Sequence, residues 1–159
     1  MGVVSLARKA HKYYGLGKLG GGVMAKLIKC INRVIYSCDI AYSVDIPKST
    51  SMPHQGLGVV IHPAAKIGED CVICQNVTLG QLADGPRIFA GQVKEKHGGR
   101  GHAPSIGNNV LIGAGACILG GIIIGNNVSI AANAVVLDDV PDNAVVAGIP
   151  AKIKKYKTV

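Results

Sequence analysis

The sequence predicts an all-β solenoid with a short helical segment at its N-terminus. Two observations carry this prediction. An aliphatic residue recurs every six positions, at Ile106, Ile112, Ile118, Ile124, Ile130 and Val136. The chain has 22 glycines, one Phe and no Trp, so its core must consist of small aliphatic side chains. A period of six fits a short strand followed by a corner, repeated along the chain, and such repeats are typical of solenoids.

The first segment, residues 2–36, has the spacing of a helix. Its apolar residues fall on one face, at Val23, Met24, Leu27, Ile28, Ile31, Val34 and Ile35. Lys26, Lys29 and Arg33 interrupt the run, which is therefore too short to span a bilayer. We expect residues 1–38 to cap the end of the main domain. A basic amphipathic helix lying on a membrane surface is the alternative.

The positive charge of the chain is concentrated at its two ends. The formal net charge is +8. Residues 1–38 and the tail 152–159 contain basic residues but no acidic residue. Basic ends favour anionic partners such as phosphates or a membrane surface, whereas the lack of aromatic residues beside them argues against nucleic acid. The five cysteines form no disulfide framework, and no signal peptide is visible. A cytoplasmic location is expected, with peripheral contact at the inner face of the membrane as an option.

The repeat defines the main domain, predicted over residues 39–151. It begins at Ile40, shifts register after Met52 and resumes at Ile61. The period fails between Gly80 and Ile106, so residues 81–105 are expected to form a long excursion loop. Loops of this length inside a compact domain are usually functional or disordered.

Three stretches carry a resemblance to a known family. They read "GVVIHPAAKIGEDCVICQNVTLG", "IGNNVLIGAGACILGGIIIGNNVSIAANAVVLDDVP" and "VVAGIPAKIKK". The chain resembles the hexapeptide-repeat acyltransferases, and within them the serine acetyltransferases and the short polysaccharide O-acetyltransferases of the colanic acid type. The resemblance implies a left-handed parallel β-helix, a homotrimer, and acetyl-CoA bound between neighbouring subunits without a metal.

Acetyl transfer to a hydroxyl needs a base, and a neutral histidine suits that task near pH 7. His54 stands where the repeat changes register, fifteen residues after Asp39. The resemblance implies that His54 is the catalytic base and that Asp39 orients its imidazole. Asp45 is the competing carboxylate, but it lies only nine residues before His54, half of an eighteen-residue turn of the solenoid.

The resemblance also implies binding residues. Acceptor contacts are expected at Arg100 and His102, and cofactor contacts at Gly80, Ala114, Ala132, Lys152 and Lys154. The two alanines are eighteen residues apart, which stacks them on one edge where small side chains leave the backbone accessible to the pantetheine amides. The two lysines offer point charges to the phosphates of CoA.

The acceptor expected from the sequence is a sugar hydroxyl, in capsule, exopolysaccharide or O-antigen biosynthesis. Serine acetyltransferases have an aspartate where this chain has Pro53, a larger helical region before the repeat, and an adjacent Arg-His pair that Gly101 interrupts here. Serine O-acetylation for cysteine biosynthesis is the alternative.

Two other classes remain open. A zinc protein like the γ-class carbonic anhydrases would bind its metal through His62, His97 and His102, because the last two have four residues between them. A solenoid without catalytic activity would serve as a scaffold.

Overall fold

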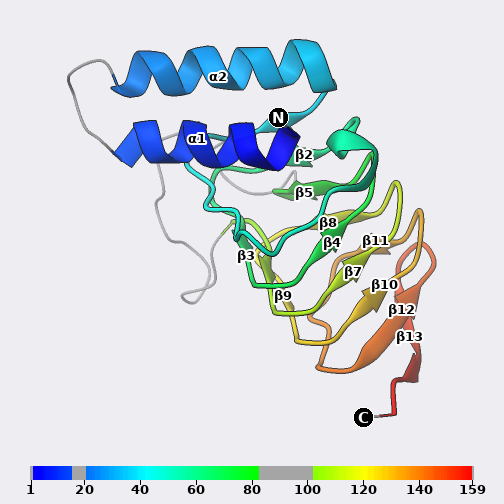
Figure 1. Ribbon diagram of the computed structural model, residues 1–159. Helices are drawn as coiled ribbons and strands as arrows, with labels where there is room; N and C mark the ends of the chain where they lie inside the picture. Colours follow the sequence, from blue (N-terminus) through cyan, green and yellow to red (C-terminus); the bar gives the residue numbers. More distant parts are fainter. Residues whose placement is uncertain (1, 16–20, 83–101, 159) are drawn as a thin grey trace.

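The computed structural model describes residues 2–15, 21–82 and 102–158. Two helices, α1 (Val3–Gly15) and α2 (Gly21–Tyr36), lie side by side over one end of a stack of short strands, and the C-terminus lies at the opposite end (Figure 1). A short turn, η1 (Pro53–Gly56), lies in the sequence between the first two strands.

After α2 the chain passes through three sheets in turn. Sheet A contains β1 (Asp39–Ile40), β2 (Val60–Ile61), β5 (Thr78–Gly80), β8 (Cys117–Leu119) and β11 (Val135–Val136). Sheet B contains β4 (Val72–Ile73), β7 (Leu111–Ile112), β10 (Ser129–Ile130), β12 (Ala144–Ala147) and β13 (Lys152–Tyr156). Sheet C contains β3 (Lys66–Ile67), β6 (Ser105–Ile106) and β9 (Ile123–Ile124). Each strand up to β12 therefore pairs with strands from neighbouring turns of the chain, whereas β13 pairs antiparallel with β12 alone.

The register of the strands explains the six-residue period. Leu79 lies opposite Ile61 on one side and Ile118 on the other, and Ile118 lies opposite Val136. All four side chains are buried. Equivalent positions of successive turns thus form a column of aliphatic side chains, spaced by about 4.8 Å as in any sheet. The predicted repeat of short strands and the parallel sheets are confirmed.

Corners between the strands are built from residues with left-handed backbone. One corner has positive φ at Ser37, Gly58, Asn76, Gly115 and Asn133, and another at Asp70, Asn109, Asn127 and Asn143. Asparagine tolerates this conformation better than other residues with a side chain. In the second corner the amides also bond to one another, because Asn109 Nδ2 donates to Asn127 Oδ1 (3.1 Å) and Asn127 Nδ2 donates to Asn143 Oδ1 (2.8 Å).

Replacing Asn127 by alanine is expected to lower the free energy of unfolding by about 2 kcal/mol. Part of this loss is the free-energy cost of holding an alanine in the left-handed conformation. The rest comes from the lost hydrogen bonds, each with a net contribution of about 1 kcal/mol. Asn127→Gly keeps the backbone conformation, so about half of the loss is expected. Urea denaturation at one protein concentration measures both. Equal losses for the two variants would show that backbone conformation contributes nothing.

The N-terminal segment is helical, as expected, but forms two helices. α1 buries Val3 and Ala7 in the core of the strand stack, and Ala25 and Ile28 of α2 are also buried. Most of the predicted apolar stripe of α2 remains exposed instead: Val23 by 73% and Val34 by 82%. Gly21 and Ala25 lie on the buried side of α2, where small residues allow the helices to approach closely.

Two predicted boundaries differ from the structure. Ser105 already belongs to β6, paired with Lys66, so the loop expected over residues 81–105 ends earlier. Residues 83–101 lie outside the described residues. The expected basic tail forms β13, which pairs antiparallel with β12 through Ala144 and Tyr156. This strand covers an edge of β12, and covered edges protect a sheet from pairing with other chains.

Candidate active site

His54 lies in a tight turn with an unusual backbone. Its φ is 54° and that of Gln55 is 58°, so two successive residues with side chains are left-handed. Both side chains are exposed. Such conformations cost free energy and cluster at functional sites. The turn therefore presents the His54 imidazole to solvent at the register shift that the sequence indicates.

The corner that follows this turn carries the two predicted cofactor alanines. Asn76 N–H donates to the carbonyl of Leu57 (2.8 Å), Gly115 N–H to that of Gln75 (3.0 Å), and Asn133 N–H to that of Ala114 (2.8 Å). Ala114 and Ala132 accordingly occupy neighbouring turns on one edge, as their spacing predicts. The turn of His54 directly precedes Leu57, whose carbonyl accepts the N–H of Asn76, so it adjoins that same edge.

Asp39 begins β1, close in the fold to this turn, because Gly58 N–H donates to the carbonyl of Ser37 (3.0 Å). Its carboxylate faces α2: Oδ1 lies 2.7 Å from Lys29 Nζ, and Oδ2 lies 3.7 Å from Arg33 Nη1. Among the described residues it makes no hydrogen bond to His54. The structure thus brings Asp39 and His54 to one region while directing Asp39 to two cations.

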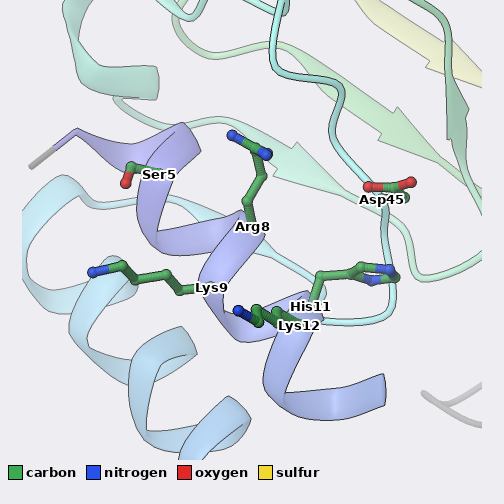
Figure 2. Close-up of a pocket in the computed structure, with 6 residues that line it drawn as sticks. All are labelled: Ser5, Arg8, Lys9, His11, Lys12 and Asp45. Atoms are coloured by element: carbon green, nitrogen blue, oxygen red, sulfur yellow. The ribbon is translucent and has the colours of Figure 1, made fainter. Parts of the chain in front are cut away.

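Asp45, the competing carboxylate, lies in a different pocket. This pocket, of about 360 Å³, is lined by Asp45 and by residues of α1. Figure 2 shows Asp45 across from Arg8 and His11, with Ser5, Lys9 and Lys12 on the same helix. The His11 Nδ1 is also 3.2 Å from the carbonyl oxygen of Tyr42. Asp45 therefore has cationic neighbours of its own.

A second pocket, of about 260 Å³, is lined by predicted site residues and by His62, which the sequence does not predict for this site. Asp39, Gly80 and Lys29 line it together with His62, which directly follows β2. His62 Nδ1 accepts a hydrogen bond from the backbone N–H of Ala64 (3.2 Å). Burial and the nearby His102 lower the pKa of the His62 imidazole below its ordinary value. A neutral imidazole whose Nδ1 is an acceptor carries its proton on Nε2.

The sequence does not assign His62 to an acetyltransferase site. Its signal is positional: it follows the inward residue Ile61, so it faces outward, and its backbone N–H donates to the carbonyl of Leu79 (2.8 Å), next to Gly80. His102, a predicted acceptor contact, is only 5% exposed and lies near His62 rather than on the open surface.

Lowering the pH is expected to destabilise the fold through His62. Its folded-state pKa lies below the unfolded value of 6.5, so below pH 6.5 the unfolded chain binds the proton more readily. Stability is thus lost as pH falls from 6.5 toward the folded pKa. His62→Gln, which retains an acceptor for Ala64, should reduce the difference between urea midpoints at pH 7.5 and 5.5. An unchanged difference would assign the pH dependence to other groups.

The remaining predicted residues are dispersed. Lys152 Nζ lies 3.6 Å from Asp138 in an exposed ion pair, and Lys154 is exposed on β13. Arg100 and His97 lie outside the described residues. Within the described part of the chain, no three His, Cys, Asp or Glu side chains are grouped as metal ligands.

Comparisons with known proteins agree with the repeat. Residues 103–138 match the family "Bacterial transferase hexapeptide (six repeats)". Serine acetyltransferase from Staphylococcus xylosus is 41% identical over 146 residues, which are 92% of this chain and 60% of that protein. Its counterpart from Staphylococcus aureus is 42% identical over 150 residues, 94% of this chain and 62% of that protein.

Solved structures give the same result. Serine acetyltransferase from Brucella abortus superposes with a TM-score of 0.81 and 32% identity, covering 98% of this chain and 56% of that one. A serine acetyltransferase in complex with CoA has a TM-score of 0.77 and 29% identity, covering 95% of this chain and 55% of that one. The chain spans less than two thirds of the length of these relatives.

The six-residue repeat and the parallel strand pairing agree with the match of residues 103–138 to the hexapeptide family. Over almost its whole length the chain is similar to serine acetyltransferases. The expectation of a sugar acceptor is wrong in the light of these relatives. It rested on Pro53, on Gly101 and on the short N-terminal segment. The match includes the N-terminal helices, since it covers 98% of the chain, and outweighs two single-residue differences.

Proposed function

We propose that this chain transfers the acetyl group of acetyl-CoA to the hydroxyl of L-serine. The observation that carries the proposal is the identity of 41–42% to proteins named serine acetyltransferase, over more than nine tenths of the chain. The likeness to a serine acetyltransferase in complex with CoA supports acetyl-CoA as the donor.

The proposed reaction uses His54 as the base. The imidazole takes the proton of the serine hydroxyl as that oxygen attacks the thioester carbonyl, and the proton then passes to the sulfur as the C–S bond breaks. O-acetylserine and free CoA result, and the histidine returns to its neutral form. Asp39 is proposed to orient this imidazole and stabilise its cationic form.

The donor is proposed to lie along the edge formed by Ala114 and Ala132. Small side chains there leave backbone N–H and C=O groups accessible to the amides of the pantetheine arm. Gly80, Lys152 and Lys154 are proposed to contact the donor as well, the lysines through its phosphates. The left-handed sense of the coil, which the family implies, belongs to the same proposal.

Release of CoA from acetyl-CoA, measured with a reagent that reacts with the free thiol, tests the activity directly. L-serine should support a kcat/KM of about 10⁴ M⁻¹s⁻¹ or more, as is usual for enzymes. Water alone and a hexose serve as control acceptors. Turnover of the hexose with none of serine would contradict the proposal.

The subunits are proposed to form a homotrimer with the donor between neighbours. The described edge of Ala114 and Ala132 is open to solvent, so one subunit alone offers a single wall. Light scattering of the purified protein should give three times the mass of the 16.4 kDa chain. An active monomer would contradict this proposal.

A peripheral membrane contact through α2 is also proposed. Its exposed apolar face, which includes Leu27 and Val34, is flanked by Lys26 and Arg33, a combination suited to an anionic lipid surface. None of the helices in the described residues has the length and apolarity needed to cross a bilayer. The cytoplasmic location expected from the sequence remains a prediction.

Sedimentation with vesicles tests this contact. Vesicles with anionic lipid should bind the protein and neutral vesicles should not. Leu27→Gln should weaken binding. Ile123→Gln is the matched control, because Ile123 is equally exposed (51% against 52%) but lies on β9 and not on α2, so it should leave binding unchanged. Equal binding by both variants would contradict the contact.

A further inference from the structure

The pocket shared by Asp39, His62 and Gly80 has no explained ligand. It lies between Lys29 of α2 and the outer side of β1, β2 and β5. Gly80, one of the proposed donor contacts, lines it, so it adjoins the donor cleft of the proposed function. Its volume of about 260 Å³ exceeds that of a small amino acid. A second substrate bound here would meet the donor at short range, as acetyl transfer requires.

The carboxylate at this pocket has more than one cationic neighbour. One carboxylate, Asp39, faces two cations, Lys29 and Arg33. The Lys29 side chain is 31% exposed, so its ammonium is partly shielded from water. An ammonium group has three donors, and the contact with Asp39 accounts for one of them. Arg33 lies outside the pocket and shares the Asp39 carboxylate, so Lys29 retains donors for a ligand with an anionic group.

His62 adds a neutral donor to this cation. Because Nδ1 accepts the N–H of Ala64, the neutral ring carries its proton on Nε2. That N–H finds no acceptor among the described residues. A carboxylate presents two oxygens, one for Lys29 and one for this imidazole.

We propose that Lys29 and His62 bind the carboxylate of the acceptor amino acid in this pocket. The inference rests on the proposed function and names residues of this chain for its acceptor. It also explains how an acceptor carboxylate is held without an adjacent Arg-His pair, since His102 is buried.

Acceptors that lack one group of serine test the inference. Ethanolamine is serine without its carboxylate, and 3-hydroxypropionate is serine without its amino group. Lys29→Gln should raise KM for L-serine and 3-hydroxypropionate about ten-fold or more, the effect of a lost charge-assisted hydrogen bond. The kcat/KM for ethanolamine and the KM for acetyl-CoA should change less than about three-fold. His62→Ala should show the same selectivity, and Lys29→Arg should restore most of the serine affinity.

Lys26→Gln is the matched control, because it removes the same charge from an exposed position of the same helix outside the pocket. It should leave all three acceptors unchanged. Equal losses for serine and ethanolamine in Lys29→Gln would overturn the inference, since Lys29 would then act through Asp39 alone.

Binding without turnover separates the two proposals. L-serine should raise the melting temperature of the wild-type protein, and this shift should be lost in Lys29→Gln. A protein that binds serine in this way but does not acetylate it would refute the proposed function and support the inference. Absence of serine binding in the wild type would overturn the inference.

Discussion

His54→Asn is expected to lower kcat for serine acetylation by about 10²-fold or more, the usual contribution of a general base. Asparagine is chosen because it tolerates the left-handed backbone that His54 adopts (φ 54°) and cannot accept the hydroxyl proton at neutral pH. His54→Ala should be at least as inactive, but it also strains the turn. The KM for acetyl-CoA should change little, because the donor is proposed to lie along the alanine edge.

Two variants separate catalysis from structure. Gln55→Ala alters the neighbouring left-handed residue of the same turn and should retain most of the activity. Asp39→Asn should lower kcat by less than the His54 variants, since Asp39 is proposed to orient the base rather than transfer a proton. Steady-state kinetics of purified proteins with matched melting temperatures decide the outcome. A His54→Asn variant with nearly full activity would refute the assignment.

The period of six predicts the column of buried aliphatic side chains, because the same position of each turn faces the core. Ile61 lies opposite Leu79 and Ile118 opposite Val136, as that period requires, and Leu79 lies opposite Ile118 across the loop that interrupts the period. The spacing of eighteen likewise places Ala114 and Ala132 on one edge. Both features follow from a backbone geometry that repeats at every turn, so the same residue spacing recurs several times in the sequence.

Outward features of the site have no such repetition. Lys29 reaches Asp39 from α2 through helix packing, which no spacing in the sequence predicts. His62 occupies an ordinary outward position and becomes notable only beside Gly80 and His102. The expected sugar acceptor is wrong because it depended on local differences such as Pro53, whereas the similarity to serine acetyltransferases extends over more than nine tenths of the chain.

A second prediction concerns the stack that holds the site. Ile118→Ala is expected to lower the free energy of unfolding by about 2–5 kcal/mol, the range for removing a large buried aliphatic side chain. Ile118 is 0% exposed and lies between Leu79 and Val136, so the backbone cannot close the cavity without disturbing both neighbouring turns. A loss of about 3 kcal/mol raises the unfolded fraction more than 100-fold.

Ile123→Ala is the matched control, because Ile123 has the same side chain on β9 but is 51% exposed. The free energy of unfolding of this variant should fall by no more than about 0.5 kcal/mol, as for most surface substitutions. Urea denaturation of both variants at one fixed protein concentration measures the difference, since subunit assembly makes apparent stability depend on concentration.

Each repeat contacts only its neighbours in a solenoid, so the damage at Ile118 should also reach the edge beside it. Weakened binding of acetyl-CoA below the unfolding transition is therefore expected in Ile118→Ala and not in Ile123→Ala. Equal stability of the two variants would contradict the idea that the aliphatic column holds the site in place.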